Sequence, residues 1–320
     1  MSTLRILVVR LSSMGDVIHA LPAAATLKQS FPGCRLSWLI RPRWAPLLEG
    51  NPFVDEVIPL DRSLGAALHS IPLLRRARFD LAVDFQGLIQ SAVIAAAAGA
   101  RKLVGFGTGA VREKPAAFFY SATVEPNAAH VVDRNLELAA AVGASQAVRD
   151  FPLPQGHPEG SLPGREFVLA SPFAGWRSKQ WPLEFWSELA ARVDLPIVLN
   201  GPLSAARELS EIAGVFLHAS GIPGLIDATR KATAVIGVDS GPLHVAAALG
   251  KPGIALYGPT DPARNGPYGG SIRVLRAEGA VTDYHRREEP DPSMRALTPE
   301  IAAQALTEVL EKAAREDHRG

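Results

Sequence analysis

Short apolar runs alternate with stretches of helical spacing along most of the chain. The first apolar run, residues 4–9, is rich in Val and Ile and ends in a Ser/Gly turn, after which apolar residues recur every three or four positions over residues 17–30. Apolar runs without polar alternation are typical of strands buried on both faces of a parallel sheet, and the second spacing is typical of a helix. The opening of the chain therefore predicts a strand, a tight turn and a helix.

The same alternation continues to residue 257. In the first half we expect strands at residues 35–40 and 81–85, and helices at residues 44–49, 89–98 and 128–142. In the second half we expect strands at residues 167–170, 197–200, 234–238 and 254–257, and helices at residues 183–191, 204–212, 222–231 and 244–249. Strands that alternate with helices form parallel sheets, so the expected fold class is α/β.

The length of the chain and one loop-forming segment indicate two domains. A chain of 320 residues is too long for one ordinary hydrophobic core, and residues 151–165 contain four prolines and three glycines, as linkers do. We expect Rossmann-like domains at residues 1–155 and 156–320, with a cleft between their strand ends. A final helix is predicted at residues 298–316, after a Thr-Pro-Glu start, and it could pack back on the first domain.

Composition and charge narrow the class of protein. An apolar fraction of 47% and a charged fraction of 20% are globular values, and the formal net charge is only +1. Residues 1–150 contain 16 Lys and Arg against 12 Asp and Glu, whereas residues 151–320 contain 17 against 20. The positive first half could receive an anionic substrate or lie against an anionic membrane face, but it is far less basic than a dedicated nucleic-acid binder.

Cysteine content and hydropathy predict the compartment. Cys34 is the only cysteine, which rules out an internal disulfide and fits a reducing cytoplasm. Arg5, Arg10 and Asp16 interrupt the first apolar stretch, so no signal peptide is evident, and the longest later apolar run, residues 92–100, is about half a membrane span. We expect a soluble cytoplasmic protein.

Asp16 is the first candidate for chemistry. It follows the first strand and lies where the first helix begins. Ligands of open α/β sheets bind outside the carboxyl ends of the strands, so this carboxylate could be a reactive acid. An aspartate at this position also caps helices, and local sequence leaves both roles open.

A second strand-turn-helix pattern lies at residues 234–249. Small residues and Pro242 precede the helix, and a helix start of this kind binds phosphate through its free amides and its dipole. His244 could donate to a phosphate oxygen or be an ordinary core histidine. Asp239 could bind a sugar hydroxyl or cap the helix, but holding the loop is the role that we expect.

Two further loops follow strands of the second half. In residues 171–182, Lys179 is the cation that we expect on a pyrophosphate, with Arg177 as its local competitor, while Trp176 could be a packing residue. In residues 257–262, a glycine and two prolines should expose Thr260 and Asp261 to a ligand, although a rigid turn uses the same residues.

Absent motifs exclude several chemistries. The chain has no Asp-x-Asp, no His-Glu-x-x-His, no paired cysteines, no Walker loop and no Gly-x-Ser-x-Gly, so we expect neither a tightly held metal nor a cofactor. Residues 105–109 are glycine-rich, but they do not follow the first strand and lack the third glycine of a dinucleotide fingerprint. A dinucleotide-dependent oxidoreductase is therefore disfavoured.

Five motifs match a known family in order and spacing over nearly the whole chain. They are Ser-Ser-Met-Gly-Asp-Val-Ile-His-Ala-Leu-Pro at residues 12–22, Asp-Phe-Gln-Gly-Leu at 84–88, Lys-Gln-Trp-Pro at 179–182, Val-Asp-Ser-Gly-Pro-Leu-His at 238–244, and Tyr-Gly-Pro-Thr-Asp-Pro at 257–262. Together they resemble the ADP-heptose:lipopolysaccharide heptosyltransferases of glycosyltransferase family 9. Residues 112–115 (Arg-Glu-Lys-Pro) and 119–120 (Phe-Tyr) are similar to the heptosyltransferase I type in particular.

This resemblance implies a GT-B fold with an acceptor domain followed by a nucleotide-sugar domain. It implies inverting, metal-independent transfer of heptose from ADP-heptose to the Kdo/lipid A inner core of lipopolysaccharide. The enzyme would be a cytoplasmic monomer, peripheral to the inner face of the inner membrane, with no nucleic-acid partner. Two alternatives are another family 9 transferase, such as heptosyltransferase II or one with a different donor, and a non-catalytic sugar-nucleotide binder.

The resemblance also assigns roles to individual residues. Asp16 is similar to the family's general base, and Lys179 to its donor-phosphate lysine. The other residues assigned to the donor are Asp239, Ser240, Gly241, His244, Thr260 and Asp261, and those assigned to the acceptor are Arg62, Arg112, Arg134, Ser13 and Gly15. The sequence departs from the family where Ala174 and Gly175 replace hydroxyl residues and Ser240 replaces a threonine. We further expect the Asp16 carboxylate to point into the cleft instead of folding back on its own helix.

Overall fold

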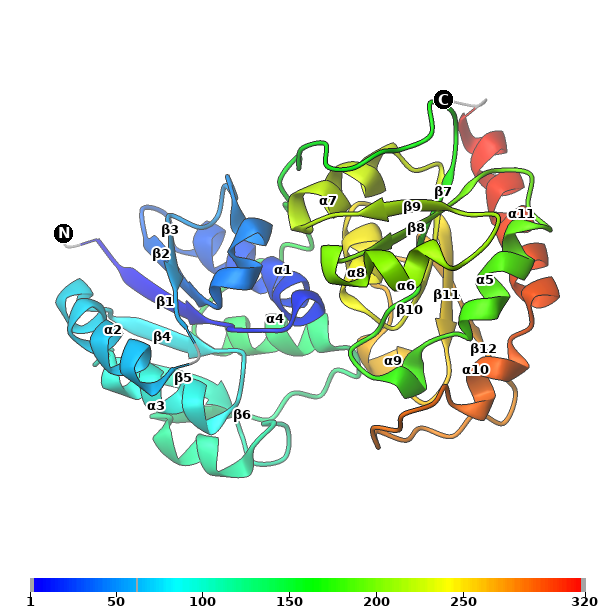
Figure 1. Cartoon of the computed structure of the whole chain (residues 1–320). Coiled ribbons are helices and arrows are strands. Elements are labelled where there is room, and N and C mark those ends of the chain that lie inside the picture. Colours follow the sequence, from blue (N-terminus) through cyan, green and yellow to red (C-terminus); the bar gives the residue numbers. More distant parts are fainter. Residues whose placement is uncertain (1–2, 62, 318–320) are drawn as a thin grey trace. The chain divides into compact units, whose positions relative to one another are not determined.

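The computed structural model describes residues 3–61 and 63–317, and the chain divides into two compact units (Figure 1). The units are Met1–Pro154 and Gln155–Gly320. Each contains one six-stranded sheet in which every strand pair is parallel. The expected α/β fold class is thus confirmed, and the observed division lies one residue before the expected boundary.

The first sheet has the strand order β3-β2-β1-β4-β5-β6. Its strands are β1 (Arg5–Val9), β2 (Arg35–Ile40), β3 (Glu56–Pro59), β4 (Leu81–Asp84), β5 (Lys102–Phe106) and β6 (Ala122–Val124). Its α-helices are α1 (Met14–Ser30), α2 (Leu64–Ala77), α3 (Ile89–Ala97) and α4 (Val131–Ala141), and its 3-10 helices are η1 (Pro42–Leu48) and η2 (Lys114–Phe119).

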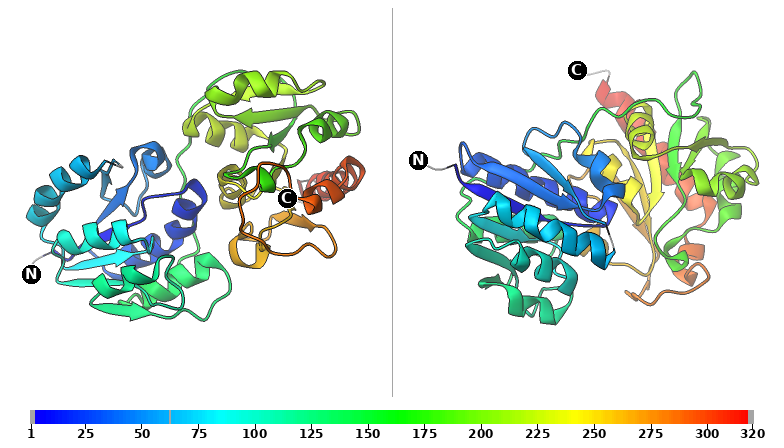
Figure 2. Two further views of the ribbon diagram at one scale, coloured as in Figure 1. Left: turned by 60° about the horizontal axis from the view of Figure 1, so that its bottom comes forward. Right: turned by 60° about the vertical axis from the view of Figure 1, so that its left-hand side comes forward.

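The helices of the first unit form two layers, one on each face of the sheet (Figure 2). Helix α1 packs on α4 and η1, whereas α3 packs on α2 and η2. Right-handed crossovers explain this division, because the chain reverses its direction across the sheet between β3 and β4. The buried Asn135 of α4 donates from Nδ2 to the backbone oxygen of His19 in α1 at 3.0 Å, which fixes these two helices against each other.

The second sheet has the strand order β12-β11-β10-β7-β8-β9. Its strands are β7 (Val168–Ser171), β8 (Ile197–Gly201), β9 (Phe216–Ala219), β10 (Ala234–Val238), β11 (Gly253–Tyr257) and β12 (Ile272–Arg276). Its helices are η3 (Arg177–Lys179), α5 (Leu183–Ala190), η4 (Leu203–Ala205), α6 (Ala206–Ser210), α7 (Ile222–Lys231), α8 (Gly241–Ala248), α9 (Pro262–Asn265), α10 (Pro292–Ala296) and α11 (Pro299–Asp317).

Helix α11 packs against α5, β10 and β11 of its own unit. Two fully buried indoles, Trp181 and Trp186, meet edge to face beneath it with ring centroids 4.9 Å apart. The Trp181 Nε1 donates to the backbone oxygen of Leu297 at 2.7 Å, just before α11 begins. Packing of this helix on the first unit stays a prediction.

Two segments differ from the sequence-based expectation. The predicted helix at residues 44–49 is part of the 3-10 helix η1, in which Pro46 cannot donate the backbone hydrogen bond that an α-helix requires. No strand was predicted at residues 102–106, but they form β5, in which a Cβ atom on Gly105 would come within 2.3 Å of the Tyr120 ring. None of the helices within residues 3–61 and 63–317 is both long and apolar enough to cross a bilayer.

Candidate active site

Asp16 lies in the first turn of α1, directly beyond the carboxyl end of β1. Its Oδ1 pairs with Nη2 of Arg10 at 2.5 Å, and its Oδ2 accepts from both the backbone N and the Oγ of Ser13 at 3.0 Å. The expectation that this carboxylate stays clear of its own helix start is therefore wrong. Asp16 caps α1 with one oxygen and carries an ion pair on the other, and its side chain remains 28% exposed.

The surroundings of Asp16 favour its ionised form. Burial raises the pKa of this carboxyl, but the positive charge of Arg10 and the hydrogen bonds from Ser13 lower it by more, so the pKa lies below its ordinary value. The charge of Arg112 acts in the same direction. Asp16 is thus a carboxylate at neutral pH, which is the form that can accept a proton.

The lowered pKa of Asp16 predicts a pH dependence of stability. A carboxyl whose pKa is lower in the folded state stabilises the fold above its unfolded pKa, and this contribution is lost as the pH falls toward the folded value. The free energy of unfolding of the wild-type protein should be larger than that of Asp16→Asn. This difference should be constant above about pH 5 and should shrink below about pH 4. Urea unfolding of both proteins across this window checks it, and a gap that widens in acid would contradict it.

The loop before Asp16 is fixed by Gln86, which follows β4. The Oε1 of this buried glutamine accepts from the backbone N of Leu11 at 2.9 Å and of Ser12 at 3.0 Å. Arg10 donates from Nη1 to the backbone oxygen of Phe85. The second motif of the sequence therefore holds the first, because β1 and β4 are neighbours in the sheet.

Asp84 organises the start of this supporting loop. Its Oδ1 accepts from the backbone N of Gln86 at 2.8 Å and of Gly87 at 3.2 Å, and its Oδ2 accepts from the hydroxyls of Ser91 and Tyr120, both at 2.8 Å. Burial raises the pKa of Asp84 even though all four hydrogen bonds lower it. Sequence reasoning used this motif only for the resemblance and did not identify Asp84 or Gln86 as site residues.

We predict that Gln86→Leu destabilises the protein and slows its reaction. The exchange leaves the amides of Leu11 and Ser12 without their acceptor, and an unsatisfied buried amide costs about 1–3 kcal/mol. Urea unfolding measures the loss. Gln304→Leu, the same exchange at an exposed position of α11, is the control and should leave stability within about 0.5 kcal/mol of wild type.

The residues assigned to an acceptor lie in different parts of the first unit. Ser13 is the N-cap of α1. Arg112 is exposed, and its positive charge lowers the pKa of Asp16. Gly87 lies against the backbone of residues 111 and 112, where a Cβ would come within 3.2 Å of the Arg112 N.

The other residues assigned to an acceptor are Arg134, Gly15 and Arg62. Arg134 of α4 donates from Nε to the backbone oxygen of Ala128 at 2.8 Å. Gly15 is buried in the first turn of α1, and Arg62 lies outside the described residues.

Lys179 ends η3, beyond β7 of the second unit. Its Nζ donates to the backbone oxygen of Asp239 at 2.9 Å and pairs with the Oδ2 of Asp239 at 3.0 Å. The Lys179 side chain is 13% exposed, whereas that of Arg177 is 59% exposed. The ion pair of Arg177 is long, with 3.9 Å between its Nη2 and the Oε1 of Glu208. Of the two competing cations, Lys179 is the one built into the loop that follows β10.

Asp239 joins the ends of three neighbouring strands, β7, β10 and β11. Besides Lys179, it lies 3.5 Å from the hydroxyl of Tyr257 and 3.9 Å from Nε2 of His244, both measured at Oδ1. Burial and the charge of Asp239 raise the pKa of Tyr257 well above its ordinary value, so this hydroxyl stays neutral and donates. Asp239 therefore connects side chains beyond three strands, its expected function of holding the loop stays a prediction, and Tyr257 is a further neighbour that the sequence reasoning did not assign.

The loop after Asp239 leads directly into helix α8. Ser240 is its N-cap, Gly241 is its first residue, and the buried Oγ of Ser240 has no hydrogen-bond partner within the described part of the chain. The first amides of a helix have no partner within the helix and, with the helix dipole, attract anions. The ammonium of Lys179, which is paired with Asp239, and the first amides of α8 are thus hydrogen-bond donors at one loop.

The third loop of this sheet edge differs partly from its prediction. Thr260 is buried and not exposed as expected, and its Oγ1 lacks a hydrogen-bond partner among the residues described. Asp261 caps α9 by accepting from the backbone N of Ala263 at 2.9 Å, a function that the sequence analysis did not predict for it. The hydroxyls of Ser240 and Thr260, together with that of the buried Ser178 in η3, are thus polar groups with remaining hydrogen-bonding capacity beyond the strands of this sheet.

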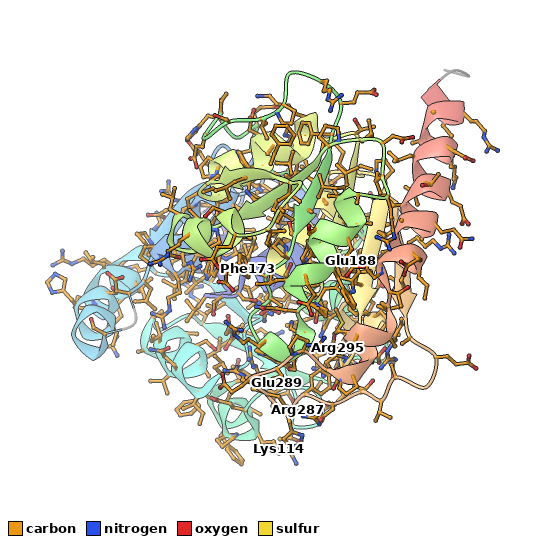
Figure 3. The ribbon with its side chains drawn as sticks, turned by 45° about the vertical axis from the view of Figure 1, so that its right-hand side comes forward. Lys114, Phe173, Glu188, Arg287, Glu289 and Arg295 are labelled. Carbon is orange, nitrogen blue, oxygen red and sulfur yellow. The ribbon has the colours of Figure 1, made fainter. Side chains whose placement is uncertain are left out.

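An aromatic and cationic group beside Lys179 was not predicted. The Lys179 Nζ lies 4.8 Å from the centre of the Trp176 ring, and the Arg286 guanidinium lies 5.5 Å from the same centre. Tyr284 meets Trp176 edge to face at 6.3 Å. Tyr284 and Arg286 belong to the segment on which Figure 3 labels Arg287 and Glu289. This segment lies far from Trp176 in the sequence, so sequence patterning gave no signal of the contact.

Possible metal ligands are dispersed. Over residues 3–61 and 63–317, no group of three or more His, Cys, Asp or Glu side chains is placed to hold a metal ion. Asp239 and His244 form a pair, and the other charged partner at that loop is the ammonium of Lys179.

Two parallel-sheet units, each with polar groups at the carboxyl edge of its strands, define a GT-B type glycosyltransferase. Residues 70–293 match glycosyltransferase family 9 (heptosyltransferase). The chain is 31% identical to lipopolysaccharide heptosyltransferase 1 of Escherichia coli O18:K1:H7, over 97% of this chain and 99% of the relative. It is 29% identical to lipopolysaccharide heptosyltransferase 2 of Salmonella typhimurium, over 96% and 99%.

Among solved structures, the chain is similar to E. coli heptosyltransferase WaaC with ADP-2-deoxy-2-fluoro heptose. The identity is 28%, the TM-score is 0.76, and the match covers 95% of this chain and 99% of that one. The chain belongs to glycosyltransferase family 9, and it is a transferase of the heptosyltransferase type.

Proposed function

We propose that this enzyme transfers heptose from ADP-heptose to the Kdo/lipid A inner core of lipopolysaccharide. The observation that carries the proposal is the loop in which the nearly buried Lys179 pairs with Asp239 directly before the start of α8, so that an ammonium and free helix amides are available to a diphosphate. The relative of known structure was solved with an ADP-heptose analogue, which supports the same donor here.

The donor half of the mechanism follows from charge. As the bond between the sugar and ADP breaks, negative charge develops on the departing diphosphate and needs preorganised donors. We assign this function to Lys179, His244 and the amides after Gly241, and we assign Thr260 and Asp261 to the binding of the donor. Because these groups can compensate the charge, the proposed reaction needs no metal and no cofactor.

The acceptor half is a single displacement with inversion. Asp16, ionised at neutral pH, takes the proton from the acceptor hydroxyl as that oxygen attacks the anomeric carbon. Arg62, Arg112 and Arg134 are assigned to the phosphates of the acceptor, and Ser13 and Gly15 to its sugar. A binding protein without activity would use this carboxylate only to cap α1 and to pair with Arg10, so the turnover of Asp16→Asn separates the two functions.

The type of heptosyltransferase is the finer part of the proposal. Identity of 31% to a type 1 enzyme and 29% to a type 2 enzyme separates the two weakly. Residues 112–115 and 119–120 favour type I, and we infer a cytoplasmic monomer at the inner face of the inner membrane. Heptosyltransferase II and another nucleotide-sugar donor remain the alternatives.

Product mass tests donor and acceptor together. The purified enzyme is incubated with ADP-heptose, ADP-glucose or UDP-glucose, and with either Kdo-lipid A or the same acceptor already carrying one heptose. We expect one added heptose on Kdo-lipid A from ADP-heptose alone. Transfer only to the heptosylated acceptor would replace type I by type II, and transfer from another donor would retire the heptose assignment.

A further inference from the structure

The exposed large apolar side chains of the first unit gather on one helical layer. Among the described residues of this unit they lie on α2, α3 and η2 and on no other element. They are Leu73, Ile89, Val93, Phe118 and Phe119. We call this set the apolar band, and its three helices are in mutual contact through α3, on the sheet face opposite α1 and α4 (Figures 1 and 2).

The exposure within the apolar band is unusual. Phe118 is 85% exposed and Phe119 is 42% exposed, although a phenylalanine is among the side chains most stabilised by leaving water. On α3, Ile89 and Val93 are four residues apart and share one face of the helix. Single exposed apolar residues are ordinary, but several on neighbouring helices of one layer favour a surface that contacts another apolar phase.

The charges on the three helices of the apolar band have one sign, and the acid beside them, Glu113, accepts from the backbone N of Ile89. Helices α2, α3 and η2 contain no Asp or Glu, and their charged residues are Arg75, Arg76 and Lys114. By contrast α4, on the other face, carries Asp133 and Glu137. Apolar and aromatic side chains rimmed by cations are the composition that binds the surface of an anionic bilayer.

The apolar band is also joined to the acceptor residues of the first unit. Glu113 accepts from the backbone N of Ile89 at 2.7 Å, which ties the start of α3 to the segment that leads into η2. Arg112, whose charge acts on Asp16, immediately precedes Glu113, and Lys114 begins η2 (Figure 3). A bilayer on this band would therefore place the head group of a lipid beside Arg112.

We propose that the apolar band of α2, α3 and η2 is the surface by which this enzyme lies on an anionic lipid bilayer. The inference rests on the proposed function in one respect: the surface would bring the enzyme to a lipid-linked acceptor in the plane of the membrane. Charge complementarity and apolar composition favour a lipid surface over a second copy of the chain, because two such cationic rims would repel each other.

Vesicle co-sedimentation without any sugar donor tests the surface. Wild-type protein should bind phosphatidylglycerol vesicles and bind phosphatidylcholine vesicles weakly. Phe118→Ser should lower the partition coefficient by about 10-fold, and Lys114→Gln by about 5-fold, since one apolar side chain and one cation are lost from the interface. Leu203→Ser, the same kind of exchange at a 74% exposed leucine of the second unit, is the matched control and should bind like wild type.

Turnover separates this proposal from the proposed function. With detergent-dispersed acceptor, Phe118→Ser should react like wild type, and with vesicle-embedded acceptor it should react about 10-fold more slowly at limiting lipid. Vesicle binding without heptose transfer would retire the function and keep the surface. Vesicle binding unchanged in Phe118→Ser, or a dimer in solution that this exchange dissolves, would overturn the lipid surface.

Discussion

Asp16→Asn should lower the rate of transfer by a factor of about 10² to 10⁴ while leaving ADP affinity within about two-fold of wild type. The exchange removes the group that accepts the proton, and it changes neither the size of the side chain nor any residue of the second unit. Steady-state kinetics at saturating substrates give the rate, and calorimetric titration with ADP gives the affinity.

Asp80→Asn is the matched control for this experiment. Asp80 also accepts a backbone amide, from Arg5 at 3.0 Å, and also pairs with an arginine, Arg101 at 3.5 Å. It precedes β4, so it lies at the amino edge of the same sheet, away from the edge that carries Asp16. Asp80→Asn should keep wild-type turnover, and an equal loss in both variants would show that the effect is structural.

Lys179→Ala should weaken ADP binding by about 10- to 100-fold and lower the rate as well. A hydrogen bond to a charged group contributes about 1.5–3 kcal/mol, and the exchange also leaves the nearly buried carboxylate of Asp239 without its cation beside the incoming diphosphate. The uncompensated negative charge then opposes the ligand. Titration with ADP and steady-state kinetics measure both effects.

The neighbouring cation supplies the control for Lys179. Arg177→Ala removes the same formal charge two residues away, but Arg177 is well exposed and its partner is Glu208. Screening by solvent should limit its effect on ADP affinity to about three-fold or less. If Arg177→Ala weakened binding as much as Lys179→Ala, the assignment of the donor lysine would be wrong.

Sequence patterning predicted the parts of the fold that rest on local signals. The apolar run before Asp16 and the small residues before Gly241 mark strand ends and helix starts, because their spacing and turn chemistry are local properties. It missed β3, β6, β9 and β12, which are all edge strands and are short or lack a continuous buried run. It also missed the inner strand β5, whose glycine-rich end was compared only with a dinucleotide loop. The requirement for glycine at position 105 could not be predicted, because it comes from a tertiary contact, the close approach of the Tyr120 ring.

The candidate sites show the same limit. Asp16 looked like either a cap or a reactive acid, and the structure shows that a carboxylate with two oxygens can cap with one while the other meets Arg10. Gln86 was not identified, because its function depends on the adjacency of β1 and β4. The contact of Arg286 with Trp176 joins segments over a hundred residues apart, and no local pattern contains it.

The configuration of the new glycosidic bond tests the central claim most directly. In the proposed mechanism the acceptor oxygen, deprotonated by Asp16, attacks the anomeric carbon on the side opposite the departing ADP, and such a displacement inverts that carbon. Wild-type enzyme with ADP-heptose and Kdo-lipid A should give a product whose anomeric coupling in NMR shows configuration opposite to that of the donor, and Asp16→Asn should give almost none. A product with retained configuration would contradict the account.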